Sequence, residues 1–392
     1  MADLEFSPYD FYGVDSDPYP VYARLRAEAP VYRNEELDFW ALSRHGDVVA
    51  ALRDSRRFSS ANGPLLEASV WGPAARRALS FIAMDPPDHT RMRGLVSRGF
   101  TPRRVAELES HIREVARRHV DTALAKGEVD FVGDIAARIP TDVISELVGV
   151  PEAERGELRR LADLAMHREP GGREMTAEGL AALMELIGHF ADLVSDRRLR
   201  RQDDLVSALL EAEVEGDRLR DEEVVAFLHL LVGAGNETTT NLLGNAVYWA
   251  WRHPDQKALA FEGRAREWVE ETLRYDTVAP TLLRTLTCDA ELHGVKLPSG
   301  SRIVLLPGAA NRDPAVFAEP DRYALEREFG PVISFGSGPH FCLGASLARL
   351  EARVTLEEFT ARVTDFDLDM SRASRRQSPY VRGFATLPVA VM

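Results

Sequence analysis

The sequence is poor in cysteine, lacks a long apolar run and carries no excess of positive charge. Cys288 and Cys342 are its only cysteines, and their wide separation excludes a disulfide framework and favours a reducing compartment. No run of about eighteen apolar residues occurs, so no segment is expected to span a membrane. Residues 1–20 have neither a basic start nor an apolar centre, so a signal peptide or membrane anchor is not expected. We therefore expect a cytoplasmic protein.

The charge balance and the length bound the class of protein. The net charge of −14 argues against nucleic acid as a partner, because binding to phosphates needs a basic surface. With 45% hydrophobic and 28% charged residues, the chain has the composition of a globular protein that can bury a large core. Its 392 residues allow one large domain or two or three ordinary ones, and no internal repeat divides them.

Helical periodicity dominates the chain, and short strands account for the rest of the expected regular structure. Helices are predicted at 17–30, 44–52, 103–125, 129–150, 221–253 and 264–275 and after residue 344, and two more lie between 152 and 199 on either side of Pro170-Gly171-Gly172. Strands are predicted at 31–32, 39–42, 292–295, 302–306 and 385–389, with another after Pro280. The expected fold is mainly α with a small β-rich subdomain.

The string Phe335-Gly-Ser-Gly-Pro-His-Phe-Cys-Leu-Gly344 surrounds one cysteine with three glycines, and a helical pattern follows at once. Glycine permits positive φ and close approach of the backbone to a flat ligand. The N-terminus of the following helix favours the thiolate form of Cys342. With no second cysteine nearby, a structural zinc site is excluded, whereas axial ligation of a haem iron needs one such thiolate. The alternative is a packing cysteine in a glycine-rich loop.

The helix predicted at 221–253 is apolar nearly all round, which is typical of a buried central helix, and would be roughly 50 Å long. Gly233-Ala234-Gly235-Asn236-Glu237-Thr238 interrupts that pattern at its middle. Each glycine inside a helix costs ~1 kcal/mol relative to alanine, and threonine can hydrogen-bond to the preceding turn. An acid at the weakened centre of a buried helix indicates a functional site, the alternative being a simple kink.

Two weaker patterns gain meaning only from their context. His89 and Arg93 share one helix face, where they could hold the two propionates of a haem, although such a pair by itself is typical of a solvated surface. Glu271 and Arg274 are spaced i, i+3, as in many surface ion pairs that contribute only ~0.3 kcal/mol.

Together these strings resemble the cytochrome P-450 family. Residues 335–344 fill every fixed position of its haem-binding pattern F-G-x-G-x-H-x-C-x-G, and 234–238 match its oxygen-binding motif A-G-x-[D/E]-T. Residues 89–93 match its His-x-x-x-Arg pattern, and 271–274 match E-x-x-R. The resemblance covers essentially the whole chain and implies a single cytochrome P-450 domain, residues 1–392, with a long central helix over one haem b.

The resemblance also implies roles for particular residues. Cys342 would ligate the iron, and Glu237 and Thr238 would be catalytic, with Glu237 relaying protons and Thr238 holding dioxygen and a water molecule. Gly235 would let dioxygen approach the backbone. The remaining cofactor-binding residues would be His89, Arg93, Ala234, Gly235, Arg284, Phe335, Gly336, His340 and Gly344. A structural network of Glu271, Arg274 and Arg322 would hold the cysteine loop in place.

The implied reaction is monooxygenation, in which a lipophilic small molecule is hydroxylated or epoxidised with dioxygen. The expected pocket residues are Leu65, Trp71, Phe81, Ile82, Leu231, Ala234, Thr281, Leu282 and Leu283, and their apolar character favours a terpenoid, a steroid, a lipid or a secondary-metabolite intermediate. The same fold could instead catalyse oxidative coupling, dehydrogenation or cyclisation. A non-catalytic haem-binding sensor is a further alternative, against which the pair Glu237 and Thr238 argues, since a sensor needs no proton relay.

Electrons must come from another protein, because the chain contains no flavin or iron–sulfur segment. The resemblance implies a ferredoxin and a ferredoxin reductase, with NAD(P)H as the electron source. Since such ferredoxins are generally acidic, a basic patch is expected near Cys342. The candidates are Arg98, Arg103, Arg104, Arg113 and Arg349.

Overall fold

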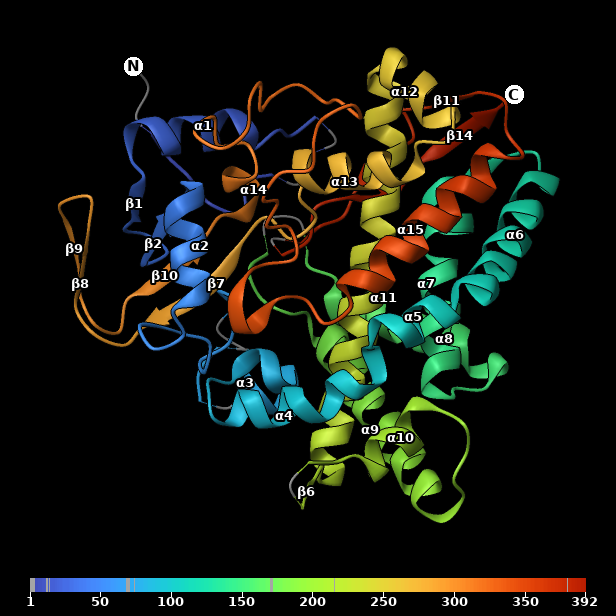
Figure 1. Ribbon diagram of the computed structural model, residues 1–392, viewed down its shortest axis with the longest axis horizontal. Coiled ribbons are helices and arrows are strands. Elements are labelled where there is room, and N and C mark those ends of the chain that lie inside the picture. The colour runs from blue at the N-terminus through green and yellow to red at the C-terminus, as the bar shows by residue number, and fades with distance from the viewer. Residues whose placement is uncertain are drawn as a thin grey trace.

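The computed structural model describes residues 4–392, except 12, 14, 68–70, 74, 170–171, 215 and 379. Most of the strands and the first helices lie on one side of the molecule, and the longer helices lie on the other, together with the strands near the C-terminus (Figure 1). The described part is mainly α with small β-sheets, as predicted. Pro170 and Gly171 of the predicted break between two helices lie outside the described residues.

The helices follow the apolar periodicity of the sequence. Their bounds are α1 Tyr19–Glu28, α2 His45–Arg53, α3 Ala75–Leu79, α4 Asp88–Val96, α5 Pro102–Glu107, α6 Glu109–Ala125, α7 Arg138–Val148, α8 Glu152–Met166, α9 Ala177–Leu199, α10 Leu205–Glu211, α11 Asp221–Arg252, α12 Pro254–Phe261, α13 Ala265–Tyr275, α14 Pro307–Ala310 and α15 Ala345–Thr360. Shorter 3-10 turns are η2 Ser80–Ala83, η3 Ser97–Phe100 and η5 Gly338–His340, and η4 Phe131–Ala136 is a π-helix.

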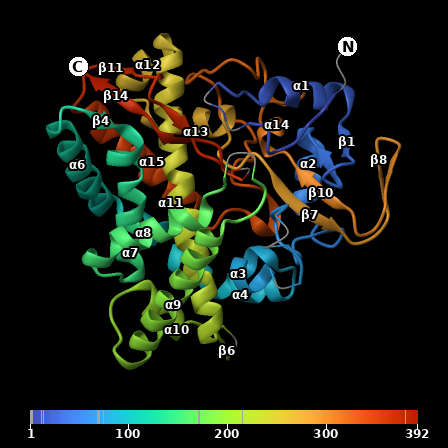
Figure 2. The same cartoon turned by 180° about the vertical axis from the view of Figure 1, so that it is seen from behind.

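Helix α11 runs through the helical part of the molecule, with α15 crossing in front of it in Figure 1 and α8 lying beside it in Figure 2. It packs against α7, α9, α13 and α15. Phe227, Leu228 and Val232 on this helix are buried, as its all-round apolar pattern predicted. Its first turn is acidic, and Arg91 of α4 donates from Nη1 to Glu223 Oε1 at 2.8 Å, which fixes the start of α11 against α4.

A mixed five-stranded sheet has the order β1-β2-β10-β7-β3. Its strands are β1 Val31–Asn34, β2 Phe39–Leu42, β3 Phe58–Ser59, β7 Leu282–Leu286 and β10 Arg302–Leu305. The predicted hairpin of β1 and β2 is confirmed, and β10 pairs with β2 in parallel and with β7 in antiparallel fashion. This pairing holds β7, which carries Arg284, in the interior of the sheet.

Smaller two- and three-stranded sheets complete the β structure. Their strands are β4 Val129–Asp130, β5 Glu213–Val214, β6 Asp217–Arg218, β8 Ala290–Leu292, β9 Val295–Leu297, β11 Phe366–Leu368, β12 Ser374–Arg375, β13 Phe384–Thr386 and β14 Pro388–Val391. The strand predicted at 385–389 is thus divided between β13 and β14.

The strand predicted at 292–295 is wrong. Leu292 ends β8 and Val295 begins β9, and His293 and Gly294 form the tight turn between them, because both adopt positive φ, at 52° and 78°. Two consecutive left-handed residues are what a two-residue hairpin turn requires, and glycine at the second position favours it. The strand residues on either side of this turn made the whole segment look like one continuous strand in the sequence.

The core consists of one large cluster among the helices and two smaller clusters against the sheet. One small cluster contains Leu52, Phe58 and Ile303, and the other contains Phe6 and Tyr22. Among the helices of the described ranges, none has the length and apolarity that crossing a membrane would require.

Candidate active site

The cysteine string forms a tight loop against α2. Gly336 and Gly338 have φ of +74° and +73°, and the Cys342 N–H donates to the Phe335 carbonyl at 2.9 Å. A Cβ at Gly338 would lie 2.8 Å from the Leu52 carbonyl oxygen, so this glycine is needed both for its backbone angle and for space. The loop geometry therefore explains two of its three glycines.

Cys342 lies immediately before α15, and its side chain is accessible. Desolvation by the surrounding protein atoms raises the pKa of the Cys342 thiol. The N–H groups of Gly344 and Ala345 act to lower it, as do the positive charges of Arg93 and Arg349. Open space lies where a Cβ of Gly344 would project, and its φ of −85° does not require glycine. Neither the backbone angle nor the space around it therefore requires glycine at position 344.

Four basic side chains from three separate segments meet near this loop. His89 and Arg93 come from α4, Arg284 comes from β7, and His340 comes from η5. The imidazole rings of His89 and His340 have centroids 4.1 Å apart, and Arg93 Nη2 donates to the carbonyl oxygen of Phe341 at 2.6 Å. Burial lowers the pKa of His89 to about 4, that of His340 to about 3 and that of Arg284 to about 10, and the neighbouring positive charges lower each histidine further.

Several polar atoms of this cluster have no hydrogen-bond partner within the described residues. Within the described part of the chain, both ring nitrogens of His89, Nη1 of Arg93 and Nε2 of His340 are buried without a hydrogen-bond partner. Such an atom costs about 1–3 kcal/mol when it stays unpaired. Asp85 is the acid near His89 and Arg284, and its negative charge acts to raise the pKa of both. Its carboxylate already accepts from Ser59 Oγ and from the Ser60 N–H. The cluster therefore fits an anionic group, and the two propionates of a haem b have the right charge.

The centre of α11 carries a threonine and small residues on one face. Thr238 Oγ1 donates to the Ala234 carbonyl at 2.7 Å, and Thr240 Oγ1 donates to the Asn236 carbonyl at 2.8 Å. These bonds to the preceding turn are those expected of threonine inside a helix. Leu231, Ala234 and Thr238 share one helix face through their i, i+3 and i+4 spacing, and Ala234 is exposed.

Gly235 has a packing role that the sequence did not indicate. Its missing Cβ points at α7, where an added methyl group would lie 2.2 Å from Ile144 Cδ1. The glycine thus allows α11 and α7 to approach each other closely.

We expect Gly235→Ala to lower the free energy of unfolding by about 1–3 kcal/mol, because the added methyl overpacks the contact between α7 and α11. Ile144→Ala in the same chain should restore part of that loss, since it removes the clashing Cδ1 atom. Gly233→Ala is the matched control, because nothing lies within 4 Å of its added Cβ. Urea unfolding of the wild type, the two glycine variants, Ile144→Ala alone and the double variant measures the effect, and additive losses in the double variant would contradict it.

Glu237 is buried beside Arg376, a residue that follows β12. Arg376 Nε lies 3.3 Å from Glu237 Oε1. Burial raises the pKa of Glu237 to about 7, Asp163 adds to the rise, and Arg376 and Arg168 oppose it. A carboxyl group with a pKa near neutrality can both accept and release a proton, which a proton relay needs. The sequence analysis missed Arg376, because nothing local to residues 374–378 marks it.

Glu271 and Arg274 of α13 form a buried bidentate pair, with Nε to Oε2 at 2.8 Å and Nη2 to Oε1 at 2.7 Å. The prediction of Arg322 as their third member is wrong. Its side chain is 55% exposed and pairs with Glu319, and only its backbone carbonyl accepts from Arg274. Arg327 takes the place instead, with Nε 3.4 Å from Glu271 Oε2. The chain turns between the two arginines, so the later one faces α13.

The residues predicted to line the substrate pocket divide into separate groups. Phe81, Ile82 and Leu231 belong to the large cluster, where Phe81 lies against His89 and Phe227. Trp71 and Leu283 instead pack in the small cluster around Tyr22, and Leu282 packs in the other. Leu282 and Leu283 point to opposite faces because successive side chains of a strand alternate. The structure therefore does not bring all nine residues to one surface.

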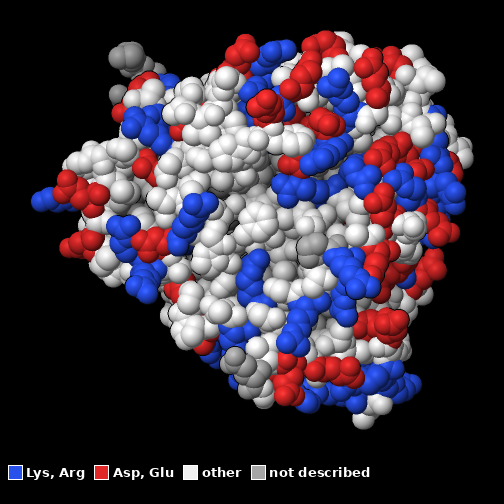
Figure 3. Space-filling view, viewed as in Figure 1, with Lys and Arg blue, Asp and Glu red and all other residues white. Residues whose placement is uncertain are grey.

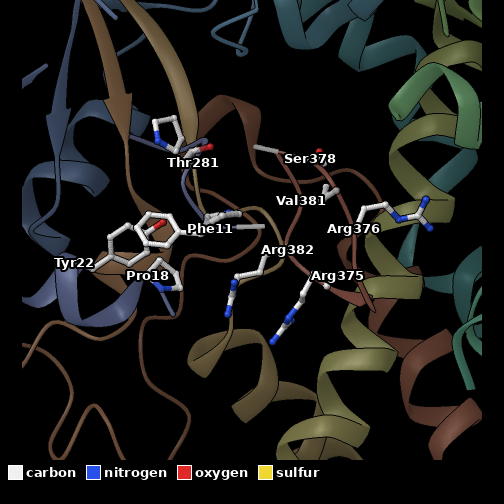
Figure 4. Close-up of a pocket in the computed structure, with 12 residues that line it drawn as sticks. Phe11, Pro18, Tyr22, Thr281, Arg375, Arg376, Ser378, Val381 and Arg382 are labelled. Carbon is white, nitrogen blue, oxygen red and sulfur yellow. The ribbon is translucent and has the colours of Figure 1, made fainter. Parts of the chain in front are cut away.

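Thr281 and Leu65 take up positions near other parts of the chain. Thr281 is buried at a junction with the N-terminal and C-terminal segments, in the hollow that Figure 4 shows between Phe11 and Tyr22 on one side and Ser378 and Val381 on the other. Leu65 is partly buried, two residues before Glu67. The sequence analysis did not assign the C-terminal segment to this region.

A buried polar group beside Leu65 was also missed. The Glu67 carboxylate accepts from Arg168 Nη2 at 2.6 Å, from the Met175 N–H at 2.7 Å and from Tyr380 Oη at 3.2 Å. Neither side chain of the Glu67–Arg168 pair is more than 4% exposed. It ties together three segments that are far apart in the sequence, so no local pattern could have indicated it.

Comparisons with known proteins agree on one family. The family model described as Cytochrome P450 matches residues 265–390. Cytochrome P450 123 of Mycobacterium tuberculosis is 52% identical over 392 residues, which cover 99% of this chain and 97% of that protein. Vitamin D(3) 25-hydroxylase of Pseudonocardia autotrophica is 38% identical, with coverage of 96% and 94%.

Solved structures agree with the sequence comparisons. Cytochrome P450 CYP109Q5 from Chondromyces apiculatus has a TM-score of 0.87 and 34% identity, over 96% of this chain and 95% of that one. The fold, the cluster of basic side chains beside the cysteine loop and these relatives lead to one conclusion: the chain belongs to the cytochrome P450 family of oxidoreductases, whose members bind haem b.

Proposed function

We propose that this protein hydroxylates a lipophilic small molecule and that Cys342 is the iron ligand of its haem. The observation that carries the proposal is the set of buried, unpartnered donors on His89, Arg93 and His340, which lies beside the loop of the only cysteine at a helix N-terminus. When bound, thiolate-ligated haem b supplies the reductive activation of dioxygen and oxygen transfer to the substrate.

The residues of the chain divide this work among them. His89, Arg93, Arg284 and His340 would hold the propionates, and the glycines of the cysteine loop let the backbone donate to the sulfur. Thr238 would hold a water molecule or dioxygen on the open face of α11, and Glu237 would pass protons to it. Phe81 and Leu231 would help to exclude water from the reacting face.

The substrate class is tested by spectroscopy and isotope labelling. The name of one relative, vitamin D(3) 25-hydroxylase, makes vitamin D(3) the first compound to try, beside a steroid and a branched fatty acid. A lipophilic compound that fits should shift the haem from low to high spin, and one atom of labelled dioxygen should appear in its product. Coupled, dehydrogenated or cyclised products without the label would favour those alternative reactions over hydroxylation.

We expect Thr238→Ala and Glu237→Gln each to lower the rate of product formation by about 10²- to 10⁴-fold, because a positioned proton donor is lost. Electrons from NAD(P)H should then leave as hydrogen peroxide instead of entering product. Thr238→Ser is the matched control, since it keeps a hydroxyl group that can reach the Ala234 carbonyl. Undiminished coupling in Thr238→Ala would overturn the proton-relay assignment and favour a different proton source.

The proposed electron donor is a ferredoxin, which would dock on the face that α15 shares with the cysteine loop. Figure 3 shows basic side chains over the middle of the face seen in Figure 1 and acidic ones mainly towards the right and upper edges. Arg113 and Arg349 are already paired with acids of the chain, Glu357 and Glu270 among them, and Arg103 pairs with Glu107.

Three exposed arginines remain for such a partner. Arg98 and Arg104 form no ion pair within the described residues. Arg53 donates to Ser337 Oγ inside the cysteine loop at 2.9 Å, so it lies at the centre of the proposed surface, although the sequence did not mark it.

Reversing the charge of Arg53, Arg98 and Arg104 together should slow reduction by a ferredoxin about tenfold or more at low salt, because electrostatic steering is lost. The difference should shrink as ionic strength rises. Charge reversal at Arg24 and Arg160, which are engaged in surface pairs elsewhere, is the matched control. Stopped-flow reduction measures the rate, and equal rates in all the variants would place the docking surface elsewhere.

A further inference from the structure

Arg376 is anchored so that its side chain must point at α11. Its backbone N–H donates to the Gly383 carbonyl at 3.1 Å, which fixes this residue within the C-terminal hairpin. In Figure 4 its side chain extends towards the helices, whereas Arg375 and Arg382 on the same segment extend in another direction. The Arg376 side chain is 17% exposed, and that of its partner Glu237 is 6% exposed. The guanidinium thus lies between the buried acid and the outside.

The other end of Arg376 reaches a second acid. Its Nη1 lies 3.5 Å from Oδ1 of Asp163 on α8, and the Asp163 side chain is 46% exposed. Arg159, on the same helix, lies 3.8 Å from the second oxygen of Asp163. The charges therefore alternate in sign from the interior to the surface, in the order Glu237, Arg376, Asp163.

A cavity of about 20 Å³, enough for about one water molecule, adjoins this row of charges. It lies between α7, α8 and α11, and its lining includes Thr141, Met166 and Asn236. Both carboxylate oxygens of Glu237, Nε of Arg376 and Oδ1 of Asn236 are buried without a hydrogen-bond partner in the described part of the chain. A polar cavity with several unpartnered groups is the kind of site that ordered water fills.

We propose that Arg376 is a positioning residue that holds the Glu237 carboxylate at the inner end of a hydrated cavity, with Asp163 as the counter-charge at the outer end. The inference rests on the proposed function, in which Glu237 passes protons to Thr238, and adds the groups that position the Glu237 carboxylate. The ion pair of Glu237 and Arg376 departs from hydrogen-bonding geometry, so water can bond to both partners and exchange protons with the carboxylate.

The charged groups around Glu237 shift its pKa in opposite directions, so variants of these groups should have opposite effects. Arg376 and Arg168 lower the pKa of Glu237 and Asp163 raises it, while α7 contributes only the neutral Thr141 to the cavity lining. Replacing Arg376 should therefore move the titration of Glu237 to higher pH, and replacing Asp163 should move it to lower pH. A residue that only supported the fold would not produce shifts of opposite sign.

Infrared titration of the ferric holoenzyme tests the inference, with Glu237→Gln identifying the carboxyl band of Glu237. In Arg376→Gln we expect the titration midpoint to rise by about one pH unit or more, because a nearby opposite charge is lost. Arg376→Lys should restore much of the original midpoint, and Asp163→Asn should lower it. Arg372→Gln is the control, since Arg372 pairs with Asp369 and Glu128 instead.

The outcomes separate this inference from the proposed function. An unchanged midpoint in Arg376→Gln, in protein that retains its haem spectrum, would overturn the inference. Should Arg376→Gln fail to retain haem, Asp163→Asn decides, and an unchanged midpoint in that variant would overturn the inference equally. The relay role of Glu237 itself fails only if Glu237→Gln leaves the coupling of electrons to product unchanged.

Discussion

Replacing Cys342 with serine is expected to abolish oxygen insertion and to move the absorption band of the ferrous carbon monoxide complex away from the position typical of a thiolate ligand. A serine hydroxyl does not ionise at neutral pH, so the electron donation that favours cleavage of the oxygen–oxygen bond is lost. Turnover should fall below detection.

The variant should still take up some haem, because the propionate cluster lies on other residues. His89, Arg93 and His340 have buried polar atoms without a hydrogen-bond partner, and Arg284 adds a buried positive charge, so none of these groups depends on the side chain at position 342. Haem content per protein, measured after reconstitution, should therefore fall less than activity does. Cys288→Ser is the matched control, since Cys288 is an exposed thiol between β7 and β8. An unchanged carbon monoxide spectrum in Cys342→Ser would show that Cys342 is not the ligand.

The second large effect is expected at the buried pair behind the cysteine loop. Glu271→Ala leaves the Arg274 guanidinium, 1% exposed, without its carboxylate, and breaking such a pair typically costs about 3–5 kcal/mol. It also removes the acceptor of the Ala324 N–H, which lies 2.9 Å from Glu271 Oε1. Urea unfolding should show the loss directly. Glu270→Ala, which breaks only a partly exposed pair with Arg349, should cost about 1 kcal/mol or less.

Arg322 and Arg327, which follow this pair in the sequence, should differ in how much each contributes to the free energy of unfolding. Arg327 lies 3.4 Å from Glu271 and donates to the carbonyls of Glu319 and Arg322 at 3.0 Å, so Arg327→Ala should cost about 1–3 kcal/mol. Arg322→Ala should change the free energy of unfolding by no more than about 0.5 kcal/mol, because its side chain is exposed. The reverse order would show that Arg322 is the third member after all.

Local patterns predicted most of the secondary structure. Helix α11 was expected at 221–253 and is observed at Asp221–Arg252, because its buried residues, its acidic first turn and the proline after it are all encoded locally. The hairpin of β1 and β2 was predicted for the same kind of reason. The failure at 292–295 arose where the backbone angles of His293 and Gly294, rather than the apolar alternation, decided the structure.

The candidate site was predictable where a motif places its residues within a few positions of one another. His89 and Arg93 share a helix face by spacing alone, and Glu271 with Arg274 does the same. Residues whose role depends on contacts with distant parts of the sequence were not predicted, or were predicted at the wrong position. Arg376 reaches Glu237 from the C-terminal hairpin, and Glu67 meets Arg168 across 101 positions of sequence.

The sequence by itself determined the family, the helical class and the position of the cysteine loop, because periodicity and closely spaced motifs are local properties of the chain. Only the tertiary structure decided that Gly235 makes room for Ile144, that Arg327 rather than Arg322 faces Glu271, and that Arg376 lies between Glu237 and Asp163. These contacts join elements far apart in sequence. Their geometry is set by how whole helices and turns pack, which no short stretch of residues encodes.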